Sequence, residues 1–291
     1  MQRLIFVRNG GNKDNPEDTV VICSERSPTL RYVIGSPKGL GAVGVRKKSA
    51  TAAGMDGSYL QGVELEDRTV TDTITILGKT RTEMYENRIH LQRVLNPHFG
   101  IGTLYYVNDF GQWKIDALPD VYGKAGERIA ESKCKADVSF YCPDPYWTDI
   151  APQKIYLSQR AEEGIPLPTE LPAVFPKGRV NQYLLNPSGE EAFTRVVITG
   201  PAKGVRIVNK TTGDEMKFDR ILEPGEQLIL DSKECTARLI TKNGTAEVVI
   251  PRYGYRFITL KPGVNHIMVE WYRAFPGASA TMEWVCRYVG V

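Results

Sequence analysis

Strict alternation of apolar and polar positions marks the clearest strand in the chain. In residues 133–142, which read KCKADVSFYC, every second residue from Cys134 to Cys142 is apolar, and the residues between are mostly polar. A period of two predicts a half-buried β-strand. Pro143 and Pro145 follow at once, and because a proline cannot extend a hydrogen-bonded ladder, we expect the strand to end at Cys142. The stretch FYCPDPYW therefore indicates a strand terminus rather than a reactive site.

The same period recurs in the first half of the chain. Residues 69–77, TVTDTITIL, place Val70, Ile74 and Ile76 on one face and threonines on the other. Residues 102–118 alternate on both sides of the turn residues NDFG, which predicts a β-hairpin.

A single helix is predicted within residues 79–97. Thr80 and Glu83 have the spacing of a capping box, and Pro97 ends the helical pattern. The apolar stripe comprises Met84, Leu91 and Leu95, widened by Tyr85, Ile89 and Val94. Asn87 falls among the polar positions, and His90 is interpreted as a surface residue. We expect this helix to lie on a sheet.

The second half is a proline-rich stretch followed by many short strands. Residues 148–182 are rich in proline and show no hydrophobic periodicity. After residue 182, nine short apolar segments alternate with turn residues such as Asn243-Gly244. This spacing predicts a β-sandwich. The chain is therefore expected to be all-β with one helix. We divide it into a domain over 1–147, a connector over 148–182 that packs on the second domain, and a domain over 183–291.

Composition narrows the class of protein. A length of 291 residues favours about two domains. The net charge of +3 is too small to argue for nucleic-acid recognition or an anionic membrane. No window approaches the roughly 20 apolar residues of a membrane span, and no secretion signal is visible, so a cytoplasmic site of synthesis is expected. Five cysteines without a C-x-x-C pair fit reduced thiols.

Motifs for catalysis or cofactors are weak. Residues 39–44, GLGAVG, match the dinucleotide fingerprint, but no helix pattern opens directly after them, so we interpret them as part of a loop. The three histidines have no metal-ligand spacing, and no G-x-S-x-G motif occurs. We therefore expect no catalytic residue, no cofactor and no metal.

A basic segment over residues 36–58 is predicted to be a long mobile loop. Its cations could contact nucleic acid or an acidic neighbouring subunit, or could simply be solvated. The candidates for subunit contacts, here and at the 108–113 hairpin, are Arg46, Lys47, Lys48, Asp56, Phe110 and Trp113. Trp147 and Trp271 are candidates for stacking on sugar rings, although Trp271 alternates with apolar residues and burial in the core is favoured for it.

Several fragments, in their order and spacing, resemble the distal tail protein family of long-tailed bacteriophages. The first half contributes GMDGSYLQGVELEDRTVTDTITILG, GTLYYVNDFGQWKIDAL and VSFYCPDPYW. The second half contributes LLNPSGEEAFTRVVITGP, ILEPGEQLILD and FITLKPGVNHIMVEW. The basic segment after Gly35 departs from the family's pattern.

This resemblance implies a structural virion protein without enzymatic activity, assembled in the host cytoplasm. Its first domain is expected to be a β-sandwich with a flanking helix, similar to tail-tube subunits, that closes into a hexameric ring. The ring would join the tail-tube and tape-measure proteins to the tail tip or baseplate. The second domain is expected to be a galectin-like β-sandwich that serves receptor-binding proteins. The alternatives are a carbohydrate-binding module that recognises the host wall, or a tail-tube subunit.

Overall fold

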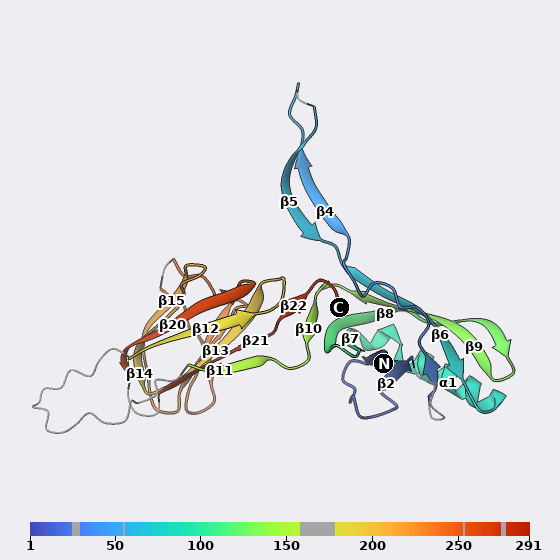
Figure 1. Ribbon diagram of the computed structural model, residues 1–291. Helices are drawn as coiled ribbons and strands as arrows, with labels where there is room; N and C mark the ends of the chain where they lie inside the picture. Colours follow the sequence, from blue (N-terminus) through green and yellow to red (C-terminus); the bar gives the residue numbers. More distant parts are fainter. Residues whose placement is uncertain (25–29, 55, 158–177, 253, 275–277) are drawn as a thin grey trace, which may run out of the picture. The chain divides into compact units, whose positions relative to one another are not determined.

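The computed structural model describes residues 1–24, 30–54, 56–157, 178–252, 254–274 and 278–291 (Figure 1). The chain forms two compact units. The first comprises Met1–Ile150 together with Tyr288–Val291, and the second comprises Ala151–Arg287. The sequence-based division assigned all residues after 182 to the second domain, and it is wrong for the last four, which return to the first unit.

One sheet that closes on itself forms the body of the first unit. Its order is β22-β10-β8-β7-β1-β2-β3-β6-β9, and β8 also pairs with β9. The strands are β1 (Arg3–Val7), β2 (Thr19–Cys23), β3 (Tyr32–Val33), β6 (Arg68–Leu77), β7 (Gly102–Val107), β8 (Gln112–Ala130), β9 (Lys133–Cys142), β10 (Trp147–Asp149) and β22 (Arg287–Tyr288). The first part of β8 pairs with β7 and its later part pairs with β9, so β8 closes the sheet on itself.

The predicted strands of this unit are confirmed. β9 has the bounds expected from its alternation, and β7 and β8 form the expected hairpin. The inward positions of β6 and β9, including Val70, Ile74 and Ala136, are fully buried and contribute to one apolar core.

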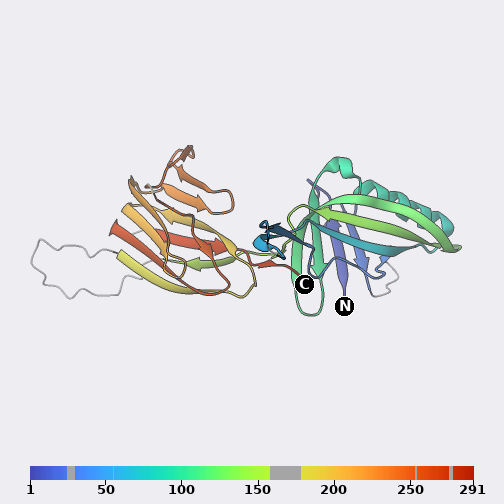
Figure 2. The same ribbon diagram turned by 90° about the horizontal axis from the view of Figure 1, so that it is seen from above.

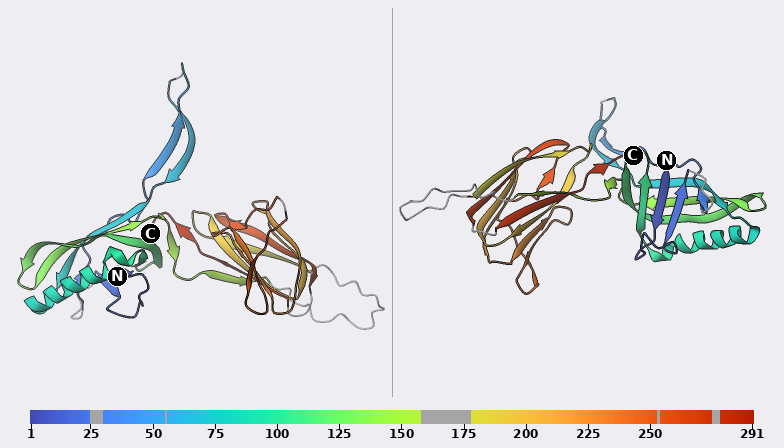
Figure 3. Two further views of the ribbon diagram at one scale, coloured as in Figure 1. Left: turned by 180° about the vertical axis from the view of Figure 1, so that it is seen from behind. Right: turned by 60° about the horizontal axis from the view of Figure 1, so that its bottom comes forward.

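The helix α1 (Arg81–Val94) lies along one side of this sheet (Figure 3) and is followed by η1 (Pro97–Phe99). The Thr80 hydroxyl accepts a hydrogen bond from the Glu83 N–H at 3.2 Å, which confirms the predicted cap. The Glu83 carboxylate accepts from the Lys79 N–H, one residue earlier than in a reciprocal capping box.

The predicted inner face of α1 needs correction. Tyr85 and Ile89 are 39% and 65% exposed, whereas Asn87 and His90 are each 7% exposed. Asn87 donates from Nδ2 to the Leu77 carbonyl at 2.7 Å, so its amide group is satisfied inside. Asn87 can be buried because its amide group is hydrogen-bonded inside the protein. The spacing of apolar residues along the sequence gives no information about such hydrogen bonds.

The loop predicted over residues 36–58 needs correction, because residues 45–50 of it form a strand that pairs with a second strand starting directly after the predicted loop. β4 (Val45–Ala50) pairs antiparallel with β5 (Tyr59–Leu65), and neither strand pairs with any other in the described part of the chain. Figure 1 shows this β4–β5 arm extending away from the sheet of the first unit. A register shift between Lys48 and Ser49 interrupts the alternation, and this explains why the sequence pattern missed both strands.

The second unit is a sandwich of two sheets, as predicted (Figure 2). The larger sheet contains β11 (Gln153–Tyr156), β13 (Ala192–Thr199), β16 (Gln227–Asp231), β17 (Thr236–Ile240), β18 (Ala246–Val248), β19 (Thr259–Leu260) and β21 (Ser279–Trp284). The smaller sheet has the order β12 (Gly178–Asn186), β20 (Gly263–Ala274), β14 (Ala202–Asn209) and β15 (Asp214–Leu222). Both sheets contribute fully buried side chains, such as Ile207, Val269 and Met282. Part of the expected connector, β11, pairs with β21, whereas residues 158–177 lie outside the described residues.

Candidate assembly surfaces

Most of the exposed aliphatic side chains of the β4–β5 arm lie on one face, together with Lys47. Directly paired residues of an antiparallel ribbon share a face, and faces alternate along each strand. The pairs Val45–Leu65, Lys47–Val63 and Ser49–Leu60 therefore place three of the strongly exposed apolar side chains on one side. These are Val45, Leu60 and Val63, at 45%, 63% and 56% exposure.

The opposite face of the arm carries Arg46, Lys48 and Glu64, whereas Lys47 lies on the same side as Val63. Arg46 pairs with Glu64 across the ribbon, and Lys48 lies two residues farther along. The Lys48 ammonium forms an ion pair with the Glu64 carboxylate, and this hydrogen bond lowers the pKa of Glu64. Of the predicted contact residues, Arg46, Lys47 and Lys48 thus lie on β4, and Asp56 lies in the loop between β4 and β5.

A buried arginine anchors the base of the arm. Arg68, the first residue of β6, is only 1% exposed and donates to four backbone carbonyls. The acceptors are the carbonyls of Gly39, Gly41, Pro145 and Val289. The guanidinium carbon also lies 5.9 Å from the Trp147 ring centroid. Burial lowers the pKa of Arg68, and its N–H groups find carbonyl oxygens instead of a carboxylate.

The glycines of GLGAVG serve this close packing. Gly39 has φ +83°, and a Cβ there would lie 2.0 Å from the Thr69 carbonyl oxygen, so only glycine fits. The segment runs against β6 without an adjoining helix, which agrees with the loop interpretation of this motif. The sequence pattern assigned Arg68 no role, because four carbonyls distant in sequence leave no local signal.

The β7–β8 hairpin presents one very exposed ring. Phe110 is 91% exposed and stacks on Trp113, with ring centroids 6.2 Å apart. Trp113 itself is 7% exposed and stacks in turn on Tyr106. The structure therefore places Phe110 at the surface and the other candidate, Trp113, beneath it as a support. Asn108 closes the turn by accepting hydrogen bonds from the Phe110 and Gly111 N–H groups.

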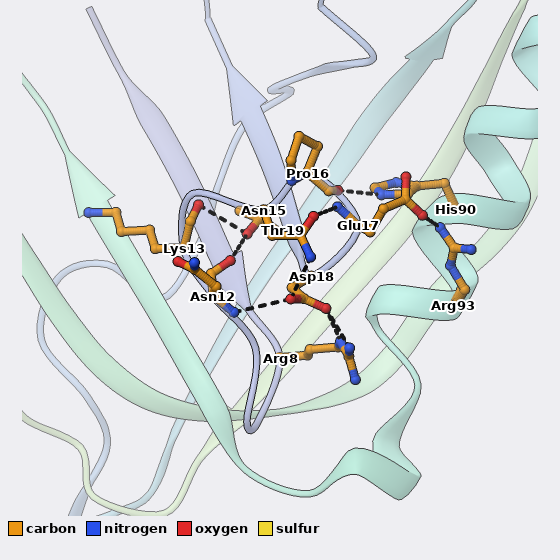
Figure 4. Close-up of polar contacts among 10 residues, drawn as sticks. All are labelled: Arg8, Asn12, Lys13, Asn15, Pro16, Glu17, Asp18, Thr19, His90 and Arg93. Atoms are coloured by element: carbon orange, nitrogen blue, oxygen red, sulfur yellow. Dashed lines mark hydrogen bonds and ion pairs between the residues drawn. The ribbon is translucent and has the colours of Figure 1, made fainter.

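Residues 8–19 form a loop that is tied to the helix (Figure 4). Asp18 accepts hydrogen bonds from the Asn12 N–H, the Arg8 guanidinium and the Asn15 amide, which together lower its pKa. His90 Nε2 donates to the Pro16 carbonyl at 2.7 Å. An ion pair joins Glu17 to Arg93. Sequence reasoning missed this cluster, although the Asn, Asp and Gly residues of the loop are typical turn formers.

The exposure of Trp147 and Trp271 tests the prediction that they stack on sugar rings. Trp147 is 0% exposed and Trp271 is 1% exposed, so neither indole presents a face on which a sugar ring could stack. The sugar-stacking hypothesis at these two residues is wrong, and the core interpretation favoured for Trp271 is confirmed. Each ring belongs to the apolar interior of its own unit.

The cysteine at the end of β9 is buried and unreactive. Burial raises the pKa of Cys142 to about 12, so its thiol stays protonated and is a poor nucleophile. No group of three or more His, Cys, Asp or Glu residues with metal-binding geometry occurs among the residues that the structure describes. In the same residues, no helix has the length and apolar character needed to cross a membrane.

Comparisons with family models match both units. Residues 33–142 match a model described as phage tail protein RIFT-related domain. Residues 190–288 match a model described as siphovirus-type tail component, C-terminal domain. Together these matches cover more than two thirds of the chain. No curated protein matches it.

Two solved phage structures have a similar fold. The chain is similar to the crystal structure of SPP1 Dit, described as a paradigm of hub adsorption apparatus in phages that infect Gram-positive bacteria. The TM-score is 0.66 at 12% identity, over 99% of both chains. A chain of the phage P2 baseplate in its activated conformation with Ca is also similar, with a TM-score of 0.50 at 13% identity over all of both chains. Identities this low establish the fold alone. The two family models, however, match successive parts of the chain, and the chain therefore belongs to the siphovirus-type phage tail component family.

Proposed function

We propose that this chain is the structural hub at the distal end of a siphophage tail, where several copies form a ring. The family membership and the fold shared with SPP1 Dit support this role. The resemblance in sequence suggests six copies. A head-to-tail interface that closes by rotation generates such a ring without requiring a self-complementary patch.

One observation carries the proposal: the β4–β5 arm has an apolar face that nothing covers in the described part of the chain. Leu60 and Val63 point to the same side and are both more than half exposed. Contiguous exposed apolar surface is rare on soluble monomers and typically marks an interface. A neighbouring copy of the chain is the occupant we propose, and Lys47, which lies on the same side as Val63, would meet one of its carboxylates.

The exposed Phe110 supports a second contact in the ring. Its ring is fixed by stacking on Trp113, so little side-chain entropy is lost when a partner covers it. We further propose that the ring joins the tail-tube and tape-measure proteins on one side and baseplate or receptor-binding proteins on the other. Assembly takes place in the host cytoplasm, and the role is structural rather than catalytic.

Substitutions on the apolar face of the arm test the proposal. Purified wild-type chain should form a ring-sized oligomer in multi-angle light scattering and closed rings in negative-stain micrographs. The double variant Leu60→Asp with Val63→Asp should remain smaller at the same concentration, because two carboxylates would have to lose their hydration when a neighbouring copy covers this face.

A matched control comes from the second unit. Leu185 on β12 is 56% exposed, comparable to Val63, so Leu185→Asp should leave the oligomer unchanged. A wild-type chain that stays monomeric at high concentration would contradict the proposal. So would a Leu60→Asp/Val63→Asp variant that still assembles like the wild type.

A further inference from the structure

An open hollow of 560 Å³ lies on the outer face of the smaller sheet of the second unit. A row of directly paired residues crosses this face: Arg179 on β12, Glu270 on β20, Arg206 on β14 and Lys217 on β15. Their neighbours along the strands point into the core. The row therefore forms a polar surface on the side of the sheet that faces away from the apolar interior.

The charged groups of the row are held in place by one another. Glu270 accepts hydrogen bonds from Arg179 at 2.6 Å and from Arg206 at 2.9 Å. Arg206 also makes two bonds of 2.7 Å with Glu215. Desolvation alone would raise the pKa of Glu270, but the hydrogen bonds from the two arginines bring it below its ordinary value. The carboxylates thus remain charged acceptors in a fixed geometry.

The backbone next to the row is irregular in a way that keeps the hollow open. The register between β14 and β15 shifts between Lys203 and Val205, and such bulges are frequent beside functional sites. Gly204 at this point has φ +61°, and a Cβ on it would lie 3.0 Å from the Cβ of Tyr272. The missing side chain leaves room beside the Tyr272 ring, which is 66% exposed.

The side chains that line the hollow carry more positive than negative charges. Asp219, another lining residue, is paired with Arg252, and Glu270 is paired with two arginines. Lys203 and Lys217 line the same hollow, and neither has an ion-pair partner among the residues that the structure describes. A ligand that carries an anionic group would supply the missing counter-charge.

We infer that this hollow binds an acidic saccharide, a pyranose that carries a phosphate or carboxylate group. The apolar face of the sugar ring would lie on Tyr272, which offers a flat and exposed aromatic surface. Sugar hydroxyl groups would donate to Glu270 and accept from Arg179, whose planar charged groups form directional hydrogen bonds. The anionic group would contact the ammonium groups of Lys203 and Lys217.

The position of the hollow disfavours an acidic peptide as the ligand. An extended peptide gains most of its affinity by pairing its backbone with the free edge of a sheet. Here most of the lining residues lie on β14 and β20, which already have strands on both sides, and Arg179 and Lys217 on the edge strands belong to the same row across the face of the sheet. The binding partner is therefore recognised by side chains only, as suits a compact ring with hydroxyl groups.

Titration of the full chain with small probes tests the inference. We expect glucose 6-phosphate to bind, as seen by isothermal calorimetry or ligand-observed NMR, at least about tenfold more tightly than glucose or inorganic phosphate, because it engages the ring and the charge together. Tyr272→Ala should weaken this binding by about three- to tenfold. Lys203→Ala with Lys217→Ala should abolish the preference for glucose 6-phosphate over glucose.

Matched variants on the larger sheet and in the turns beside its strand β17 serve as controls. Tyr156→Ala removes a tyrosine with the same 66% exposure, and Lys233→Ala with Lys242→Ala removes two exposed lysines, so both should bind like the wild type. The inference is overturned if no saccharide probe binds, or if the Tyr272 variant binds like the wild type. It is also overturned if inorganic phosphate or a hexaglutamate peptide binds as tightly as glucose 6-phosphate. These binding measurements do not require ring formation. Their outcome is therefore independent of the outcome of the test of the proposed hub role.

Discussion

His90 shows how a single residue of the helix is brought into the interior. Its Nε2 donates to the Pro16 carbonyl, and its Nδ1 lies 2.7 Å from the Tyr32 hydroxyl oxygen. The ring is 7% exposed, and this burial lowers the pKa of His90 below its ordinary value of 6.5. The neutral ring therefore joins the helix to the 8–19 loop (Figure 4) and, through Tyr32, to β3.

The pH dependence of stability follows from this shift. The pKa of His90 is lower in the folded than in the unfolded chain, so its contribution is complete above about pH 6.5 and is lost as the pH falls below that value. The free energy of unfolding of the first unit should decrease by at most about 1.4 kcal/mol per pH unit there. Urea unfolding of the wild type at pH 7.5 and pH 5.5 measures the effect.

A comparison of two histidine variants isolates the cause. His90→Gln should flatten the dependence between about pH 6.5 and pH 5. His98→Gln should leave it intact, because His98 is exposed. An unchanged dependence in His90→Gln would assign the effect to other groups.

At the scale of elements, the helix α1 depends on its cap. The Thr80 hydroxyl satisfies the Glu83 N–H, one of the donors that the first turn of any helix leaves unpaired. Thr80→Ala should therefore lower the free energy of unfolding of the first unit by about 1 kcal/mol, as measured by denaturant titration.

A second threonine in the same turn provides the comparison. Thr82 is exposed and lies inside the helix, where alanine has the higher helix propensity. Thr82→Ala should be neutral or slightly stabilising. A loss in Thr82→Ala equal to that in Thr80→Ala would show that the cap is not the source.

At this scale, the elements that could be predicted are those with a pattern of residues that are contiguous in the sequence. β6, β9, the β7–β8 hairpin and the bounds of α1 could be predicted, because alternation, turn residues and capping residues are contiguous in the chain. The β4–β5 arm could not, because it has no core side and its register shifts once. Its candidate contact residues were chosen by charge alone, and the exposed apolar side chains that share one face became visible only from the pairing.

At the scale of the whole molecule, Arg68 connects segments that are far apart in sequence. It donates to carbonyls near the base of the arm, at the exit of β9 and in the returning C-terminal residues. Val291 also donates from its N–H to the Leu40 carbonyl at 3.2 Å. One side chain thus satisfies buried backbone groups from three parts of the first unit.

Replacement of Arg68 should therefore affect one unit selectively. Arg68→Met leaves several buried carbonyls unpaired, and we expect the first unit to lose roughly 3 kcal/mol or more of its free energy of unfolding, with the second unit unchanged. Calorimetry and faster hydrogen exchange at the Val291 N–H would report this.

Arg93→Met is the control in the same unit. Its ion pair with Glu17 is exposed on both sides, so its loss should cost less than about 1 kcal/mol. Arg68→Lys keeps the charge with fewer donors and should fall between the wild type and Arg68→Met. Equal stability of the Arg68 and Arg93 variants would contradict this role for Arg68.

The sequence by itself determined the all-β class, the single helix, the main strands and the likeness to phage tail proteins, because each rests on residues that are neighbours in the chain. Tertiary structure alone decided the closure of the sheet by β8 and β9, the return of Tyr288–Val291 and the carbonyls gathered by Arg68. It also decided the burial of His90 and the hollow beside Tyr272. Each of these joins residues from separate segments, and a hydrogen bond or contact between distant segments leaves no periodicity from which it could be predicted.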